Sequence, residues 1–274
     1  EPLNWSPSSV ITQSLAVSCR FLGRLDMKVC LIIPCHNEAR RLDRTAFEEL
    51  IRSTRHVELM MVDDGSVDST AEVLQALKST TSDRLHVLCL ASNQGKAEAV
   101  RAGVQAVLAL NRFDVVGFCD ADLATPLSEM VRLTEVLDEQ DADMVFGCRL
   151  LRLGADIHRS ETRHYLGRVF ATVVSSMLDL PVYDTQCGAK VFRAPIACEL
   201  FAAEFSSRWL FDVELLARYL QSYGRELTLS KVIEAPLNVW IDHPGSKLAL
   251  RDFLIAPFEL WRIRRRYLTS HLSD

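Results

Sequence analysis

Short apolar runs alternate with amphipathic segments through the first half of the chain. The runs predict buried strands at 28–33, 57–62, 85–90, 114–119 and 143–147. Apolar residues recur at helical spacing between them, which predicts helices over 38–53, from a cap at Ser66 or Asp68 onward, over 96–110 and over 129–138. Uninterrupted apolar strands joined by amphipathic helices are typical of a parallel sheet that helices cover on both faces. We therefore expect an α/β fold with a mostly parallel central sheet.

Polar residues of unusual composition follow each predicted strand. They are PCHNE at 34–38, DDGS at 63–66, NQGK at 93–96, DAD at 120–122 and GCR at 147–149. In sheets of this class the ligand lies beyond the carboxyl ends of the strands. The coincidence indicates a functional site at that edge of the sheet.

Composition narrows the class of ligand. The 274 residues carry a net charge of −5, which disfavours general nucleic-acid binding. The segments 148–168 and 247–274 are nevertheless each net positive, so they are candidate sites for local anions, with solvated helix faces as the alternative.

Cysteine usage and hydropathy indicate the compartment. The eight cysteines form no CxxC pair, and most lie in or beside apolar runs, which favours free buried thiols in a reducing compartment over disulfides or a zinc site. We expect no transmembrane helix, because no stretch of about 18 uncharged apolar residues occurs.

Residues 1–26 are interpreted as an extension outside the fold, either vector-derived or an upstream segment, since Met27 precedes the first apolar run as a natural start would.

The DAD sequence is the strongest chemical signal. Asp120 and Asp122 are one residue apart directly after a predicted strand, so both present oxygens to one hard cation. Mg²⁺ or Mn²⁺ bound in this way keeps open positions for phosphate oxygens. The alternative is that these carboxylates only cap the following helix.

Three further segments have weaker signals. Asp63 and Asp64 end a buried strand, where an unpaired charge is costly, so we expect one to bind a base or ribose and the other to cap the next helix. His36 is placed to stack on or border a base, and Glu38 to bond a ribose or base edge. Lys96 follows Asn93 and Gly95 at a helix start, without the spacing of a phosphate-binding P-loop, and is expected to hold that loop.

These elements, in this order, resemble the nucleotide-sugar-binding half of the inverting glycosyltransferases of family 2, which have the GT-A fold. The downstream segments GCR, RSETR, DTQCGAK, RWLFDVELL and HPGSKL resemble the dolichyl- and polyprenyl-phosphate sugar synthases of that family. The β-glucosyltransferase branch is most similar, and the mannosyltransferase branch is close over the first half. The resemblance implies one catalytic domain over 27–255, with a nucleotide-sugar half at 27–149 and an acceptor half at 150–255, followed by a basic amphipathic segment at 256–274.

The resemblance also implies roles for individual residues. The nucleotide sugar would lie against Pro34, His36, Glu38, Met61, Asp63, Asp64, Lys96, Asp120, Ala121 and Asp122, with Asp122 as the principal metal ligand beside Asp120. The family commonly has an aromatic residue where His36 stands. Arg149 and Lys247 would meet the donor diphosphate or the acceptor phosphate, and Arg159 and Arg163 would clamp the acceptor phosphate.

The implied reaction moves glucose from UDP-glucose to a polyprenyl phosphate with inversion. A lipid phosphate is largely ionised near neutral pH, since its second pKa is about 6, so the enzyme needs no strong base. Asp184 is then interpreted as the partner of an arginine or as a group that orients the acceptor. The alternatives are a GDP-mannose-dependent enzyme, a family member with a hydroxyl acceptor that needs Asp184 as its base, and a non-catalytic binding module.

Two apolar stripes bear on membrane contact. Leu166, Val169, Phe170, Val173, Val174, Met177 and Leu178 recur at helical spacing, which indicates core packing, with a membrane face as the alternative. Phe253, Leu254, Phe258 and Trp261 precede the basic run 262–266, a combination that suits a helix on an anionic membrane surface or a cap on the core. We expect peripheral association with the cytosolic face of a membrane. The oligomeric state stays open.

Overall fold

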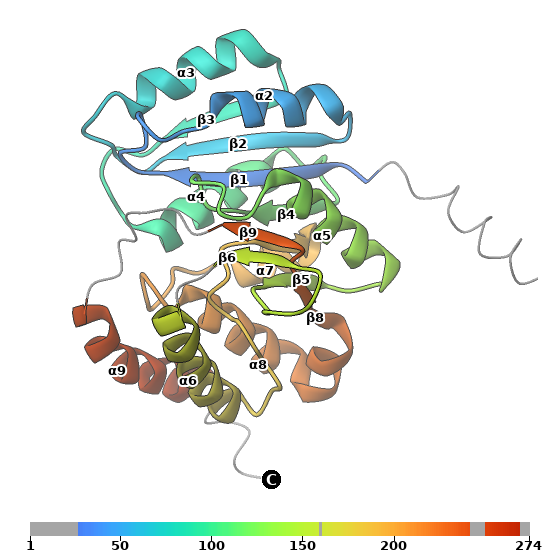
Figure 1. The fold of residues 1–274 in the computed structure, drawn as a ribbon, viewed down its shortest axis with the longest axis vertical. Coiled ribbons are helices and arrows are strands. Elements are labelled where there is room, and N and C mark those ends of the chain that lie inside the picture. Colours follow the sequence, from blue (N-terminus) through green and yellow to red (C-terminus); the bar gives the residue numbers. More distant parts are fainter. Residues whose placement is uncertain (1–26, 159–160, 242–249, 269–274) are drawn as a thin grey trace, which may run out of the picture.

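The computed structural model describes residues 27–158, 161–241 and 250–268. Within them, seven strands form one sheet (Figure 1). They are β1 (Val29–Cys35), β2 (Val57–Asp63), β3 (Leu85–Cys89), β4 (Val115–Phe118), β5 (Met144–Cys148), β7 (Lys190–Arg193) and β8 (Val232–Pro236). The helices are α2 (Arg44–Ser53), α3 (Thr70–Thr81), α4 (Lys96–Ala109), α5 (Leu127–Glu139), α6 (Glu161–Leu178), α7 (Ala194–Leu200), α8 (Phe211–Lys231) and α9 (Leu250–Tyr267).

The sheet has the strand order β3-β2-β1-β4-β7-β5-β8. Every neighbouring pair is parallel except the two that involve β7, which runs antiparallel between β4 and β5. The register pairs Val29 with Val57 and Cys35 with Asp63, so β1 and β2 end side by side. The expected α/β fold with a mostly parallel sheet is confirmed. Strands β7 and β8 were not predicted from the sequence.

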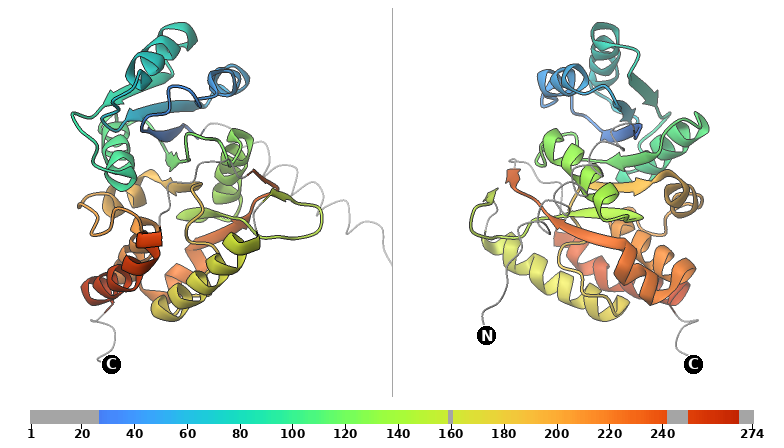
Figure 2. Two further views of the ribbon diagram at one scale, coloured as in Figure 1. Left: turned by 60° about the vertical axis from the view of Figure 1, so that its left-hand side comes forward. Right: turned by 90° about the vertical axis from the view of Figure 1, so that its right-hand side faces the viewer.

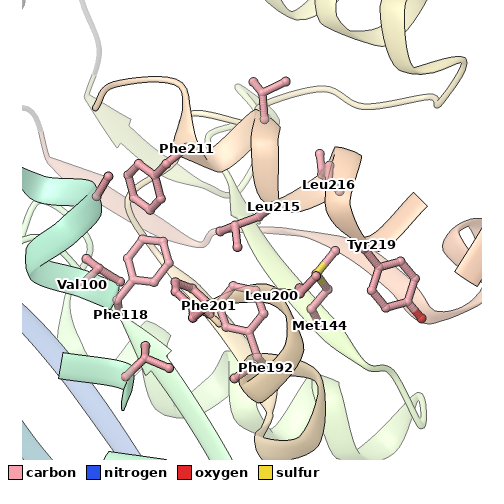
Figure 3. Packing of buried hydrophobic residues seen from close by; sticks show 14 of the residues in the cluster. Val100, Phe118, Met144, Phe192, Leu200, Phe201, Phe211, Leu215, Leu216 and Tyr219 are labelled. Atoms are coloured by element: carbon pink, nitrogen blue, oxygen red, sulfur yellow. The ribbon is translucent and has the colours of Figure 1, made fainter. Parts of the chain in front are cut away.

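Helices cover both faces of the sheet, as Figure 2 shows. On one face α2 and α3 cover β2 and β3, and α5 covers β5 and β7, so that their apolar side chains bury one cluster with those of the sheet. On the other face α4, α7, α8 and α9 bury a second cluster rich in phenylalanine, in which Phe118 and Phe192 lie beside Phe201 and Phe211 (Figure 3). Both faces are buried, which explains why the strands read as continuous apolar runs.

One helix start differs from the sequence prediction, and another falls inside the predicted range. Helix α2 begins at Arg44 instead of residue 38, because the Asp43 side chain accepts a hydrogen bond from the Ala46 N–H at 3.1 Å and caps it there. Helix α3 begins at Thr70, where Asp68 Oδ1 accepts from the Thr70 backbone N–H at 3.0 Å. The hydrogen bond from the Thr70 hydroxyl lowers the pKa of Asp68.

The apolar stripe of α6 is divided between core and surface. Val174 and Leu178 are buried against the second cluster, whereas Leu166, Val169 and Val173 are exposed. Helix α9 contacts α6 and is divided in the same way: Ile263 is buried, and Ile255, Phe258 and Trp261 are exposed. One side of each helix therefore packs in the core, as one interpretation expected, and the other side is exposed. Contact of the exposed side with a membrane stays a prediction. The side chains of Phe253 and Leu254 lie outside the described residues.

A two-stranded sheet, β6 (Asp156–His158) with β9 (Val239–Ile241), completes the second half. The seven described cysteines form no disulfide, and five of them are buried, while Cys89 and Cys198 are exposed. Within the described residues, no helix is both long and apolar enough to cross a membrane. Residues 1–26 lie outside the described part.

Candidate active site

An open pocket of about 570 Å³ lies beyond the carboxyl ends of β1, β2 and β3. Its volume is within the range of small-molecule sites. The walls come from three segments that the sequence singled out, and they are lined by His36, Asp63, Gly65, Ser66, Val67, Leu90, Ala91, Ser92 and Asn93. The strand order brings these segments together, because β1, β2 and β3 are neighbours and end at one edge.

The two consecutive aspartates have different roles. Asp63 lines the pocket, and its Oδ1 accepts hydrogen bonds from the backbone N–H and the hydroxyl of Ser66. Asp64 turns away and accepts from the backbone N–H groups of Gln94 at 2.7 Å and Gly95 at 2.9 Å, just before α4. One carboxylate therefore lines the pocket and the other holds the start of a helix. That helix is α4, whereas the sequence indicated the next helix along the chain, α3.

His36 is fixed by a network at the pocket wall. Its Nδ1 lies 2.9 Å from the Asp64 carbonyl oxygen, and its Nε2 lies 3.1 Å from Asn37 Nδ2 and 2.9 Å from Asn93 Nδ2. Two amide groups facing Nε2 favour the tautomer in which Nδ1 carries the proton and donates to the carbonyl. The ring is thus oriented by residues from three loops.

Three residues assigned to the nucleoside lie behind this wall. Met61 is fully buried in the core on the α2 side. Glu38 is buried, and its Oε1 accepts from Arg41 at 2.7 Å. Pro34 lies within β1 and is absent from the lining. The structure therefore gives these residues a supporting position, and their direct contact with a ligand stays a prediction.

The carboxylates that follow β4 lie beside Lys96. The Lys96 ammonium is 2.5 Å from Asp120 Oδ1, and Asp122 Oδ1 accepts from the Ala124 N–H at 3.1 Å. Burial acts to lower the pKa of Lys96, but Asp120 and the neighbouring carboxylates outweigh it, so this pKa lies above its usual value. Lys96 thus compensates part of the negative charge of the aspartate pair.

Backbone geometry sets the position of Asp120 from two sides. Leu123, which follows the pair, has a φ of +53°, and its N–H bonds to the Asp120 carbonyl at 3.1 Å. A left-handed leucine is uncommon and marks a turn held by its surroundings. On the other side, a Cβ at Gly188 would lie 1.9 Å from Asp120 Oδ2. The segment 184–190 is therefore in contact with the aspartate pair.

A buried ion pair lies beneath the aspartates. Lys190 in β7 is fully buried, and its ammonium is 2.7 Å from Asp212 Oδ1 at the start of α8. The ammonium also lies over the rings of Phe118 and Phe146. Burial raises the pKa of Asp212, opposed by Lys190 and Lys96, while the charge of Asp120 raises it further. Asp212 therefore belongs to the same charge cluster as the aspartate pair.

Arg149 and Asp184 form a bidentate ion pair at the end of β5. Arg149 Nε lies 2.6 Å from Asp184 Oδ2, and the NH2 nitrogen lies 2.7 Å from Oδ1. The guanidinium also lies over the Trp240 ring. Burial opposes the charge of Arg149, but Asp184 outweighs burial and raises the pKa of Arg149, and Asp120 contributes in the same direction.

Glu234 holds the backbone of this pair. Its two oxygens accept from the N–H groups of Tyr183 at 2.6 Å and Asp184 at 2.7 Å. Burial raises the pKa of Glu234. Sequence reasoning missed Glu234 and Trp240, because strands β8 and β9 were not predicted. Gly188 and Lys190 lie in the segment 184–190 that the resemblance singled out, but neither was given a role of its own.

Several assigned residues cannot be compared with the structure. Arg159 and Lys247 lie outside the described residues, as does the side chain of Arg163 in α6. Ala121 is described and is buried between the two aspartates. The acceptor-phosphate roles of the two arginines and the diphosphate role of Lys247 therefore stay predictions.

The aspartate pair fits a hard divalent cation. Carboxylate oxygens are the ligands that Mg²⁺ and Mn²⁺ prefer, and such ions are often held by one or two carboxylates together with substrate phosphates. Among the described residues no group of three or more His, Cys, Asp or Glu side chains is arranged to hold a metal. The protein would thus supply Asp120 and Asp122, and substrate oxygens would complete the shell.

Comparison with known proteins agrees with this geometry. The family model "Glycosyl transferase family 2" matches residues 30–201. A dolichyl-phosphate beta-glucosyltransferase from Mus musculus is 31% identical over 89% of this chain and 76% of its own length. One from Drosophila melanogaster is 32% identical over the same shares.

Solved structures show the same architecture. The glucosyl-3-phosphoglycerate synthase from Mycobacterium tuberculosis, in a crystal with Mn²⁺, uridine-diphosphate-glucose and phosphoglyceric acid, matches with a TM-score of 0.63 and 17% identity, over 97% of this chain and 86% of that one. This likeness confirms the GT-A fold that the motifs implied. With the family model spanning both the pocket and the aspartate pair, the chain is a glycosyltransferase that belongs to glycosyl transferase family 2.

Proposed function

We propose that the chain transfers glucose from UDP-glucose to a polyprenyl phosphate and releases UDP, forming a β-linked lipid phosphosugar with inversion. The observation that carries this proposal is the ion pair at the acceptor side. Asp184, the candidate base, has both oxygens bonded to Arg149. A carboxylate engaged in this way is a poor base, whereas an arginine beside the aspartate pair suits an anionic acceptor. The names of the similar curated proteins point to the same acceptor.

The donor side supports a nucleoside diphosphate sugar. The base and ribose would occupy the pocket beside His36 and Asp63, and the diphosphate would extend toward Asp120 and Asp122. A divalent cation on these carboxylates would neutralise the charge that develops on the leaving diphosphate. The related synthase that was crystallised with Mn²⁺ and uridine-diphosphate-glucose supports this assignment.

The reaction then needs alignment and charge neutralisation more than proton transfer. An oxygen of the lipid phosphate forms a bond to the anomeric carbon from the face opposite the nucleotide. The bond from that carbon to the UDP oxygen breaks, and its electron pair leaves with UDP. Arg149 would hold the acceptor phosphate, and its contacts with Asp184 and Trp240, which fix the guanidinium, support this role.

Product formation tests donor and acceptor together. The purified protein is incubated with Mg²⁺ or Mn²⁺, a short-chain polyprenyl phosphate, and either UDP-glucose or GDP-mannose. The proposal expects a glucosyl lipid phosphate from UDP-glucose alone, with β configuration. Product only from GDP-mannose would move the enzyme to the mannosyl branch, and UDP release without a lipid product would contradict the acceptor.

We further propose that α6 and α9 dock on an anionic membrane surface on the cytosolic side, where a lipid acceptor would be found. The two helices contact each other and expose Tyr165, Leu166, Val169 and Val173 on α6 and Ile255, Phe258 and Trp261 on α9. Arg264 and Arg265 are exposed beside them, and Arg265 lies over the Trp261 ring. Aromatic anchors next to arginines suit an anionic lipid interface.

Vesicle flotation tests the docking surface. Wild type should float with vesicles that contain anionic lipid and less well with neutral ones, while the variant with Phe258→Ser and Trp261→Ser should stay at the bottom. The matched control changes Leu227 and Leu229, two exposed apolar residues of α8, to Ser. Equal flotation of all three proteins would contradict the proposed surface.

A further inference from the structure

A cation from the second half reaches into the wall of the nucleotide pocket. Arg208 lies in the loop between α7 and α8, and its Nε donates to the Gln94 carbonyl at 3.0 Å. Its NH2 nitrogen is 3.4 Å from Asn93 Oδ1. The guanidinium lies so close above Gly95 that a Cβ at Gly95 would be 2.8 Å from Arg208 Nε. Arg208 therefore holds the turn 93–95 from outside.

This turn determines the shape of the pocket. Asn93 lines the pocket and bonds through Nδ2 to His36, which lines it from the opposite loop. Gln94 and Gly95 donate their N–H groups to Asp64, next to the pocket residue Asp63. Gly95 has a φ of +93°, which other residues rarely adopt. A shift of the turn would therefore move Asn93 and, through it, the imidazole ring.

The loop that carries Arg208 is itself held by buried groups of the second half. The fully buried carboxylate of Glu214 accepts from the backbone N–H of Ser206 at 2.8 Å and from Arg218 at 2.9 Å. The Ser207 hydroxyl accepts from the Leu210 N–H at 2.7 Å and donates to Glu259 of α9 at 2.8 Å.

The neighbour of Arg208 is anchored as well. The Trp209 ring packs on Phe170 of α6, with ring centroids 6.0 Å apart. Arg208 is thus an exposed side chain on an anchored backbone, directed at a turn of the other half. An arginine on a backbone that is not anchored would lose more conformational entropy on forming the same hydrogen bonds, because its backbone would also have to be ordered.

We propose that Arg208 is a positioning residue for the nucleotide: it holds the turn 93–95 so that Asn93 and His36 keep the shape of the base pocket. The nucleotide pocket is then completed by the acceptor half and is not a property of residues 27–149 alone. The inference rests on the proposed function only for the identity of the nucleotide.

Binding measurements without any transfer reaction test this role. UDP is titrated with Mn²⁺ present, and uridine without metal, into wild type, Arg208→Ala, Arg208→Lys and the control Arg225→Ala. Arg225 is an exposed arginine whose partner, Asp179, is also exposed. Thermal unfolding of each variant verifies that it is folded.

A positioning role predicts that Arg208→Ala weakens UDP and uridine by the same factor, about tenfold, as expected for one charge-assisted hydrogen bond. Lysine, which supplies a cation without the planar fork, should recover only part of the affinity. Arg225→Ala should bind as wild type does. In turnover, the KM for the donor should rise while the KM for the lipid phosphate stays unchanged.

Three results would overturn the inference. Unchanged affinity in folded Arg208→Ala would mean that the turn keeps its shape without Arg208. Weaker UDP binding with unchanged uridine binding would mean that Arg208 contacts the diphosphate directly. A wild type that binds GDP and guanosine instead would contradict the proposed donor, and the same ratios would then be measured with those ligands. A wild type that binds no nucleotide would overturn both proposals.

Discussion

The two halves of the chain use charged residues differently. In residues 27–149, the carboxylates of Asp63, Asp120 and Asp122 stand at strand ends beside an open pocket or a lysine. In the second half, some charges are paired with one another in the interior, as Lys190 is with Asp212 and Arg218 with Glu214. The first half thus presents polar groups to a ligand, and the second half uses them to hold loops against the first.

The largest expected effect concerns the buried pair of Lys190 and Asp212. Lys190→Met leaves the Asp212 carboxylate buried without its cation, which should lower the free energy of unfolding by about 3–5 kcal/mol. Denaturant unfolding measures this change. The double variant Lys190→Met with Asp212→Leu should recover much of the loss, and Arg225→Ala, which breaks an exposed pair, should cost less than about 1 kcal/mol. Similar losses of unfolding free energy for Lys190→Met and Arg225→Ala would contradict the claim that charges paired in the interior stabilise the second half.

The next effect concerns the contact between the halves at Gly188. In Gly188→Ala the new Cβ would lie 1.9 Å from Asp120 Oδ2, so the carboxylate has to move. Displacing a catalytic group by about 1 Å costs on the order of 100-fold, and we expect kcat/KM for sugar transfer to fall by that factor. The control is Gly154→Ala, where a Cβ has nothing within 4 Å and the φ of +81° is the only source of strain. Wild-type kcat/KM for Gly188→Ala would mean that Asp120 is not held from this side.

The smallest expected effect comes from Asp64, whose role differs from that of its neighbour Asp63. Asp64→Asn keeps one acceptor oxygen for the N–H groups of Gln94 and Gly95 but loses the other, together with the negative charge near the start of α4. We expect the free energy of unfolding to fall by about 1 kcal/mol. The variant Asp83→Asn, at an exposed position, serves as the control in the same unfolding measurement. If Asp64→Asn unfolds at the same denaturant concentration as wild type, Asp64 does not hold the helix start.

The sequence predicts the structure of the first half better than that of the second half, and the reason is physical. Continuous apolar runs such as 28–33 and 57–62 predicted β1 and β2, because strands buried on both faces have no polar alternation. Because parallel strands end at one edge of the sheet, the polar residues after these strands predicted where the pocket lies. Strand β7 was missed because it has four residues and includes Lys190, whose burial depends on Asp212 in a distant helix. The motif 208–216 includes Arg208, but the role of this side chain was not predicted, because its partners lie in the other half of the chain.

The motif resemblance supplied what local patterns could not. It marked 184–190 and 208–216 as functional, and the structure places Gly188 beside Asp120 and Arg208 above Gly95. The sequence indicated that Asp184 pairs with an arginine, and the structure pairs it with Arg149. Which arginine it would be was not predicted, because the contact depends on how the end of β5 meets the segment before β7. Met61, which the resemblance assigned to the nucleoside, is buried in the core, and its contact with a ligand stays a prediction.

The most direct measurement of the central claim is the turnover of Asp184→Asn with a polyprenyl phosphate. If the acceptor is a phosphate held by Arg149, the asparagine still offers one oxygen to the guanidinium. We then expect kcat to fall by about tenfold, the loss of one charged hydrogen bond, with the pH profile unchanged in shape. A fall of more than about 1,000-fold in a folded variant that binds UDP normally, with loss of the acidic limb of the pH profile, would identify Asp184 as a general base. That result would contradict the account and favour a hydroxyl acceptor.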